Sequence, residues 1–200
     1  MVNNKKTLAK RATQYWEDRS LEELVQLSNE PGANKDPEVL YFVALALNAR
    51  NKKREAIECW RKAQDLDPQH ENAIRALAYE LTEQAPVDSA ELFYRLVGLQ
   101  RANADDFTSL GEIRIKQDRL GEARRWLDHA LKLEPHNSLA LLAMATLYAQ
   151  VQDRSLTLDY LEKTANTQDI DLSDLAYDPQ FEFLWHDSKF EKIVAGRKNP

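Results

Sequence analysis

A near-repetition is the feature that most constrains what this chain can fold into. Residues 53–68 read KREAIECWRKAQDLDP and residues 120–135 read LGEARRWLDHALKLEP, and the two segments align at an offset of 67. Because self-similarity at a fixed period is the signature of stacked structural units, the chain is expected to be an array built from copies of one element.

The underlying period is close to 34 residues, half of that offset. Four columns of residues keep this register through four copies: Ala44, Ala78, Gly111 and Ala145; Ala56, Ala90, Ala123 and Thr157; Ala63, Val97, Ala130 and Thr164; and Pro68, Ala102, Pro135 and Asp169. Together the columns predict repeats at residues 37–70, 71–103, 104–137 and 138–171. The second and fourth copies are degenerate, since the closing proline is missing from both.

Each copy is predicted to be two antiparallel helices. The first half carries an apolar stripe with helical spacing, as in Leu40, Val43, Ala44 and Leu47, and the second half carries another, as in Ile57, Trp60 and Ala63. Short polar turns separate the halves. The small residues of the columns let the two helices approach closely, and the Asp-Pro and Glu-Pro steps at 67–68 and 134–135 end the second helix.

The composition narrows the class of protein. Only five glycines and seven prolines occur in 200 residues, so long helices are favoured. A net charge of −6 disfavours a nucleic-acid partner, because such proteins need a basic surface. Cys59 is the one cysteine, which fits a reducing compartment. The longest apolar runs, at 39–47 and 139–149, are too short to span a membrane, and no signal peptide is recognised, so a cytoplasmic protein without a membrane partner is predicted.

The flanks are expected to close the array. Residues 1–36 are interpreted as an N-terminal helical cap or a degenerate repeat. Residues 172–200 are interpreted as a C-terminal helical cap that buries the aromatic residues at 177, 181, 183, 185 and 190 against the last repeat. Residues 153–187 hold nine acidic residues against Arg154 and Lys163, which indicates either a solvated cap or a site for a basic partner.

No motif for catalysis or cofactor binding is found. The glycines do not cluster into a phosphate-binding loop, and HExxH, CxxC and EF-hand patterns do not occur. His70 and His136 occupy equivalent loops and are interpreted as polar loop residues, and Cys59 is expected to lie in the core. The sequence therefore predicts a protein without enzymatic activity, cofactor or metal.

The repeat pattern resembles that of the tetratricopeptide repeat family. The resemblance is carried by two sets of residues: Leu40, Ala44, Leu47, Ala56, Trp60, Ala63 and Pro68 in the first copy, and Phe107, Leu110, Gly111, Ala123, Leu127, Ala130 and Pro135 in the third. The resemblance implies an all-α fold, a right-handed superhelical α-solenoid of about four repeats plus helical caps. It also implies a concave wall, formed by the first helix of each pair, that holds an extended peptide or a partner helix.

Position by position, the resemblance assigns sixteen residues to this concave wall. Ten of them are predicted to bind the peptide: Tyr41, Leu45, Asn48, Asn72, Arg75, Tyr79, Thr108, Glu112, Leu142 and Thr146. The other six are Glu38, Thr82, Asp105, Ile115, Leu139 and Ala149. Tyr41, Arg75 and Tyr79 form its most distinctive patch, because tyrosine and arginine are enriched in interface hot spots. The lysine, asparagine and arginine clamp with which one well-known subfamily holds a C-terminal carboxylate is absent, since Tyr41, Leu45, Ala76, Asp105 and Ser109 stand at the matching places.

The sequence is compatible with three functions. The first is a scaffold that binds a protein or peptide partner through the concave wall. The second is an element that assembles with itself or with a larger complex through its ends, which exposure of Tyr177, Phe183 and Trp185 would favour; the oligomeric state is left open. The third is an RNA-binding helical repeat, against which the acidic balance argues.

Overall fold

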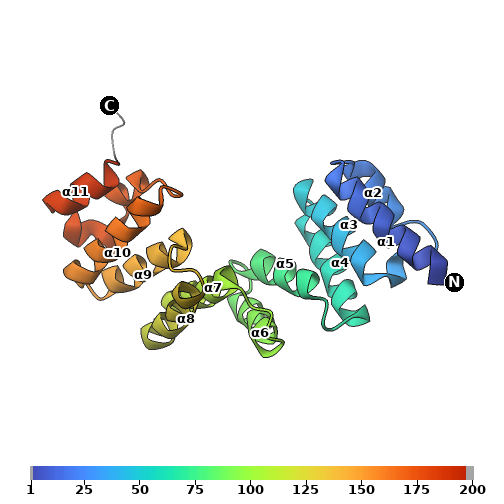
Figure 1. The fold of residues 1–200 in the computed structure, drawn as a ribbon, viewed down its shortest axis with the longest axis horizontal. Helices are drawn as coiled ribbons and strands as arrows, with labels where there is room; N and C mark the ends of the chain where they lie inside the picture. The colour runs from blue at the N-terminus through green and yellow to red at the C-terminus, as the bar shows by residue number, and fades with distance from the viewer. Residues whose placement is uncertain (1, 197–200) are drawn as a thin grey trace. The chain divides into compact units, whose positions relative to one another are not determined.

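The computed structural model describes the backbone of residues 2–196 and the side chains of residues 8–196. Within these residues every regular element is a helix, which confirms the all-α prediction (Figure 1). The chain divides into two compact units, an N-terminal unit of Met1–Arg101 and a C-terminal unit of Ala102–Pro200. None of the described helices is both long and apolar enough to cross a membrane.

The N-terminal unit contains three helix pairs. They are α1 (Val2–Glu17) with α2 (Leu21–Leu27), α3 (Pro37–Ala49) with α4 (Lys53–Leu66), and α5 (Glu71–Leu81) with α6 (Pro86–Gly98). A single 3₁₀ turn, η1 (Ala33–Lys35), connects the first pair to the second. The pairs stack in chain order, with α1 and α2 packed on α3 and with α4 packed on α5.

The C-terminal unit contains two helix pairs and a compact tail. The pairs are α7 (Ala104–Lys116) with α8 (Leu120–Leu133), and α9 (Ser138–Gln150) with α10 (Arg154–Thr167). The tail consists of two 3₁₀ helices, η2 (Ser173–Tyr177) and η3 (Pro179–Leu184), followed by α11 (Ser188–Val194). Figure 1 shows α11 lying beside α10, and η3 packs on α9.

Small residues set the distance between the two helices of each pair. The column residues Ala44, Ala78, Gly111 and Ala145 are buried, and so are their counterparts Ala56, Ala90, Ala123 and Thr157. The contact is tightest in the third pair, where a Cβ atom on Gly111 would lie 2.6 Å from Cγ of Leu127. The prediction that small side chains permit a close approach is therefore confirmed, and at Gly111 even a methyl group does not fit.

The turns inside four of the five pairs share one backbone geometry. A single residue with positive φ stands between the helices at Arg19, Asn51, Asp118 and Gln152. The next residue donates its N–H to a carbonyl five residues earlier, as from Lys52 to Leu47 (2.9 Å) and from Asp153 to Tyr148 (3.0 Å). This is the Schellman arrangement, which satisfies the last carbonyls of a helix. The pair α1/α2 uses the same turn as the repeats, which favours a degenerate repeat over an unrelated cap at residues 1–36.

Both degenerate repeats end at a left-handed residue where the proline is missing, and after α6 the full turn with its backbone bond is present. Gln100 and Gln168, which follow α6 and α10, both have positive φ, and Arg101 N–H donates to the Leu96 carbonyl at 2.9 Å. The buried threonines of the fourth repeat are also satisfied, because Thr157 and Thr164 donate their hydroxyls to carbonyls four residues earlier in the chain. The departures from the repeat pattern therefore cost no buried hydrogen bond at these positions.

A column of capping residues marks the start of each first helix. The side chains of Asp36, His70, Asn103 and Asn137 accept a backbone N–H from the first turn of α3, α5, α7 and α9. Asp171 stands one further repeat along and accepts the N–H of Ser173 at 2.9 Å, at the start of η2. The tail therefore begins in the register of a fifth repeat and then departs from it.

The tail packs an aromatic cluster onto the last helix pair. Phe181 and Phe190 are buried, with ring centroids 6.1 Å apart, against Ala145, Ala149 and Leu161. Phe183 and Trp185 pack at the edge of this cluster and are half-buried. Tyr177 differs from the expectation that the tail buries its aromatic residues, because 83% of its surface is exposed.

The substitution Gly111→Ala tests the closest helix contact. The added Cβ would overlap Leu127, which is itself fully buried, so the α7/α8 pair must shift. We expect a loss of about 1–3 kcal/mol in the free energy of unfolding, measured by urea denaturation. Gly121→Ala is the matched control, because no atom lies within 4 Å of its added Cβ and no loss is expected. Equal denaturation midpoints for both variants would contradict this packing.

The substitution Phe181→Ala tests whether the tail stabilises the last pair. Removing this buried ring should lower the free energy of unfolding by about 3–5 kcal/mol, because a cavity is left among α9, α10 and α11. Tyr177→Ala, in the same segment but on an exposed ring, should change it by no more than about 0.5 kcal/mol. A thermal melt in which the two variants behave alike would show that the tail is not part of the folded core.

Candidate functional site

The residues assigned to a peptide-binding wall lie in both units, and each unit is considered separately. In the N-terminal unit, α3 carries Tyr41, Leu45 and Asn48, and α5 carries Asn72, Arg75 and Tyr79. These six residues are called the N-terminal wall. All six are half-buried or exposed, and Tyr79 is 40% exposed although it is a large aromatic residue.

His70 joins the two helices of the N-terminal wall. Its Nδ1 accepts the N–H of Ala73 at 3.2 Å and so caps α5, while its Nε2 lies 3.0 Å from the Glu38 carboxylate on α3. Because Nδ1 acts as an acceptor, the ring proton is assigned to Nε2, which donates to Glu38. The ring also lies against Tyr41, with centroids 5.7 Å apart. The capping residue thus positions Tyr41 relative to α5.

Arg75 is held in place by charged and polar neighbours. Its guanidinium pairs with Glu71 at 2.8 Å and donates to the Arg101 carbonyl at 2.7 Å. Arg101 in turn lies 3.6 Å from Glu71, so one carboxylate serves two guanidinium groups. Since the arginine side chain is fixed before any partner arrives, little rotamer entropy remains to be lost on binding.

The two tyrosines of the N-terminal wall differ in environment. Burial raises the pKa of the Tyr41 hydroxyl, the Glu38 carboxylate raises it further, and the Arg75 guanidinium lowers it. The charges of Glu38 and Arg75 thus act on the Tyr41 hydroxyl in opposite directions. Tyr79 packs its ring edge-on against Phe93, with centroids 5.1 Å apart. Each tyrosine ring thus packs against another ring, Tyr41 against His70 and Tyr79 against Phe93, while part of its surface stays accessible.

The wall residues of the C-terminal unit are less accessible. Thr108 is 2% exposed, and its hydroxyl donates to the Ala104 carbonyl of its own helix, so it offers a ligand almost no surface. Glu112 is half-buried. Leu142 packs against the aromatic cluster of the tail, and the carbonyl of Thr146 accepts the Gln180 side chain at 3.3 Å. Part of the α9 surface that was assigned to a partner is therefore covered by the tail.

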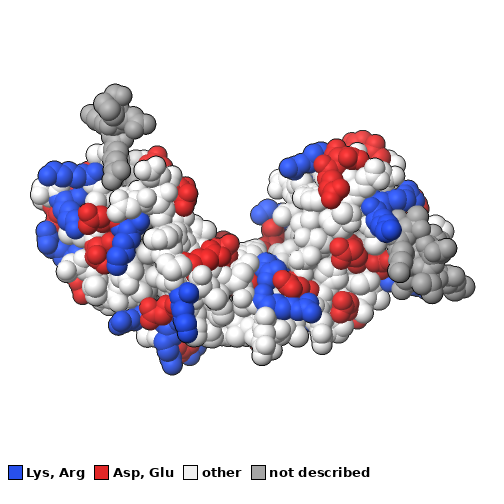
Figure 2. Space-filling model, viewed as in Figure 1, with Lys and Arg blue, Asp and Glu red and all other residues white. Residues whose placement is uncertain are grey.

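The acidic stretch at 153–187 is largely used for local structure. Asp153, Asp178 and Asp187 cap α10, η3 and α11 through their side chains. Asp187 also binds Arg154, whose Nε lies 2.6 Å away. Over α10 and α11, Figure 2 shows basic and acidic side chains interspersed. The charge thus forms helix caps and ion pairs in this segment, which argues for a solvated cap over an acidic binding surface.

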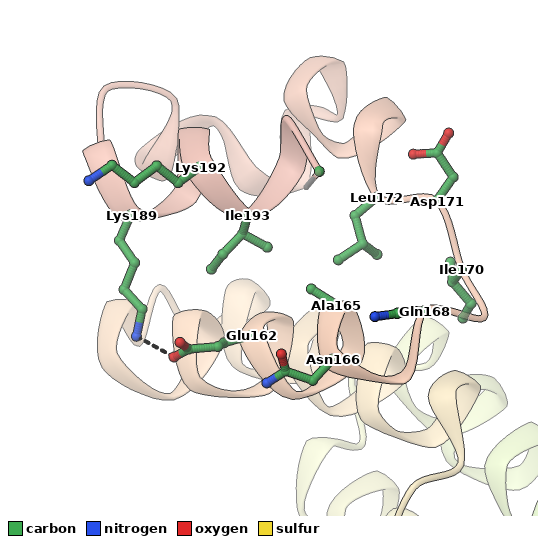
Figure 3. A pocket seen from close by; sticks show the side chains of 11 residues that line it. Glu162, Ala165, Asn166, Gln168, Ile170, Asp171, Leu172, Lys189, Lys192 and Ile193 are labelled. Atoms are coloured by element: carbon green, nitrogen blue, oxygen red, sulfur yellow. Dashed lines mark ion pairs between the residues drawn. The ribbon is translucent and has the colours of Figure 1, made fainter. Parts of the chain in front are cut away.

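A pocket of about 550 Å³ lies between α10 and α11. Figure 3 shows Ile193 and Leu172 facing the space above Ala165, with the ion pair between Lys189 and Glu162 (2.8 Å) at one end. Asn166, Gln168 and Asp171 add polar groups at the rim. The lining combines a few apolar side chains with charged and amide groups, and its lysine Lys189 is held in an ion pair with Glu162.

No catalytic arrangement emerges from the part of the chain that the structure describes. Its histidine, cysteine, aspartate and glutamate side chains form no group of three suited to a metal ion. Cys59 is half-buried on α4, and burial raises the pKa of its thiol, which lowers its reactivity as a nucleophile. The arrangement of the N-terminal wall provides aromatic, amide and guanidinium groups for binding.

The comparison with known families agrees with this geometry. Residues 37–70, which form α3, α4 and the loop to α5, match the family described as tetratricopeptide repeat. These residues are a tetratricopeptide repeat. No curated protein matches the sequence.

Solved structures share the tetratricopeptide fold over most of the chain. One is PilW, a widely conserved type IV pilus biogenesis factor, with a TM-score of 0.76 and 15% identity, covering 96% of this chain and 90% of PilW. Another is MamA from Desulfovibrio magneticus RS-1, with a TM-score of 0.71 and 18% identity, covering 82% of this chain and 94% of the MamA chain. YrrB, a tetratricopeptide protein with an unusual peptide-binding site, has a TM-score of 0.65 and 17% identity, and the match covers 88% of this chain and 90% of the YrrB chain. At these identities the likeness establishes the fold, an α-solenoid of helix pairs, which confirms the predicted fold class.

Sequence reasoning missed the part that His70 plays in the N-terminal wall. The residue was interpreted as a polar loop position, whereas it caps α5 and bonds to Glu38. Its place in the capping column, 34 residues after Asp36 and 33 before Asn103, is a signal that the sequence contains. The interpretation fits His136 better, because His136 is exposed and the neighbouring Asn137 caps α9.

His70→Ala should destabilise the N-terminal unit by about 1 kcal/mol, because the cap of α5 is lost. His70→Asn should recover most of this loss, since asparagine is a good capping residue. His136→Ala is the control for an exposed histidine at the equivalent loop, and no change is expected. Urea denaturation of the three variants measures the effect, and a loss in His70→Asn as large as in His70→Ala would disprove the capping role.

Proposed function

We propose that the protein is a non-enzymatic scaffold that binds a partner protein through the N-terminal wall. The observation that carries this proposal is that Tyr41, Arg75 and Tyr79, on α3 and α5, are each held by a neighbouring side chain while remaining half-buried or exposed. Tyrosine and arginine contribute most to interface hot spots, especially when their side chains are already ordered. Here His70 supports Tyr41, Glu71 holds Arg75, and Phe93 supports Tyr79.

The C-terminal unit supports the same binding mode less well. Thr108 has almost no exposed surface, and the tail contacts Leu142 and Thr146. We therefore place the principal contact on the N-terminal wall, with Leu45, Asn48 and Asn72 as its border. The partner segment is expected to be extended or helical and to present apolar groups to the two tyrosines and an acceptor to Arg75.

Relatives of the same fold give independent support. The residues 37–70 that match the tetratricopeptide family include Tyr41 and Leu45, and repeats of this family bind protein partners. YrrB is described as having a peptide-binding site, and its structure covers most of this chain. By this analogy we expect a peptide or protein partner and no small-molecule substrate.

Assembly through the ends of the chain is the second candidate, and one observation favours it. Tyr177 exposes 83% of its surface at the tail, which is unusual for a large aromatic residue. Phe183 and Trp185 are instead half-buried against the tail cluster, as in a cap that serves only to close the array. The N-terminal wall is the better-supported site, and Tyr177 serves as a control that separates the two functions.

The double substitution of Tyr41 and Tyr79 by alanine tests the proposal. A tagged full chain captures partners from its native host, and the principal partner is then purified and titrated by calorimetry. Loss of two hot-spot side chains should weaken binding by at least about tenfold. Tyr177→Ala should bind as the parent does. Far-UV circular dichroism and a thermal melt establish that each variant is folded.

Two results would count against the N-terminal wall. One is an unchanged dissociation constant for the double variant, which would move the site elsewhere on the chain. The other is a loss of binding, or of self-association in sedimentation, that appears in Tyr177→Ala alone. That outcome would make end-on assembly the function.

A further inference from the structure

A second surface lies in the C-terminal unit, where the loop after α8 leads into α9. A pocket of about 540 Å³ is formed there by the end of α8, the loop 134–137, the start of α9 and the first turn of α7, together with Asp169. We call it the loop pocket. It contains no residue of the N-terminal wall, so binding at the loop pocket does not depend on the function proposed for that wall.

Two exposed leucines stand at the loop pocket. Leu133, the last residue of α8, is 56% exposed, and Leu139, in the first turn of α9, is 50% exposed. Removing the surface of large aliphatic side chains from water is favourable in proportion to the area covered. Two of them at the edge of one depression form an apolar surface that a partner side chain can cover.

The lining of the loop pocket carries carboxylates and neither lysine nor arginine. The nine residues that line the loop pocket include the carboxylates of Asp105, Glu134 and Asp169 and contain no lysine or arginine. Asn137 holds two of these carboxylates together, because its Nδ2 donates to Asp105 at 2.8 Å and to Glu134 at 3.1 Å. Two like charges that share one donor attract a cation, and Asn137 itself is fixed as the cap of α9.

We propose that the loop pocket docks a partner protein segment in which a lysine or arginine stands next to a leucine-sized apolar residue. The apolar side chain covers Leu133 and Leu139, and the cation is placed between Asp105 and Glu134. A metal ion is a poorer occupant, since the described side chains contain no metal-binding group of histidine, cysteine or carboxylates. An acidic or purely polar segment should bind more weakly, because it brings no positive charge to the carboxylates of the pocket.

The first experiment titrates the ¹⁵N-labelled full chain with three short capped peptides and follows its amide resonances by NMR. The peptides contain Leu-Lys-Arg-Leu, Leu-Glu-Glu-Leu or Ser-Lys-Arg-Ser. We expect the first to shift the amide resonances of residues 133, 134 and 136–139 and of Asp105 and Asp169. Its binding should weaken as salt rises from about 0.05 M to about 0.5 M. The other two should bind at least about threefold more weakly.

Substitutions of the pocket residues separate charge from apolar contact. The double variant Asp105→Asn, Glu134→Gln keeps the shape of both side chains. It should weaken binding of the basic peptide by about threefold to fivefold and reduce the salt dependence of that binding, since Asp169 alone keeps its charge. The double variant Leu133→Ser, Leu139→Ser should also weaken binding of the basic peptide. Val151→Ser is the matched control, because Val151 is 54% exposed in the same unit but does not line the pocket.

The proposal is overturned if the acidic peptide binds as well as the basic one, or if the largest shifts lie outside the loop pocket. It is also overturned if the charge variant binds the basic peptide as the parent does. A second copy of the chain is the remaining occupant, and sedimentation velocity detects it. A dimer that the leucine variant dissociates would identify the loop pocket as a self-association surface instead. None of these results depends on Tyr41 or Tyr79, so they test the loop pocket independently of the function proposed for the N-terminal wall.

Discussion

The close approach of two helices at a pair of small residues is the contact on which the rest of the structure depends. In the third repeat this contact leaves no room for a methyl group at Gly111, and buried alanines stand at the matching places in the first two repeats. Only when the helices lie this close do the larger side chains of each pair, such as Trp60 and Leu127, become buried. The opposite face of the first helix stays outside this contact, and Tyr41 and Tyr79 lie outside the core there, half-buried and exposed respectively.

Ionic contacts in this chain mainly fix local structure. Four aspartates of the acidic stretch cap helices or a turn, and the ion pairs of Arg154 and Lys189 connect the last repeat to the tail. In the N-terminal wall, Glu71 and Glu38 hold Arg75 and His70 in fixed positions. The loop pocket differs, because its carboxylates are held together by a neutral amide and keep their negative charge available.

Much of the fold could be predicted from the sequence because the helical stripes and the small-residue columns repeat with one period. The exposure of the wall residues could not be predicted, since Thr108 and Tyr79 stand in equivalent first helices but differ in what covers them. The tail was foreseen as aromatic and packed, yet its two 3₁₀ helices and the exposed Tyr177 depend on tertiary contacts that no periodicity encodes. The capping column was present in the sequence, but its members, aspartate, histidine and asparagine, differ in chemical type and so do not look like one column.

The shared turn between paired helices has a consequence for how such a chain changes over evolutionary time. The residues with positive φ are arginine, asparagine, aspartate and glutamine, and none of them is glycine. Left-handed geometry disfavours most side chains by about 1–2 kcal/mol but excludes few of them, and the stabilising bond joins backbone atoms only. The residue at this position can therefore differ from pair to pair while the backbone bond that holds the turn persists. For this reason the same turn recurs in four of the five pairs with four different residue types, and it lies both inside and outside residues 37–70, which match the family.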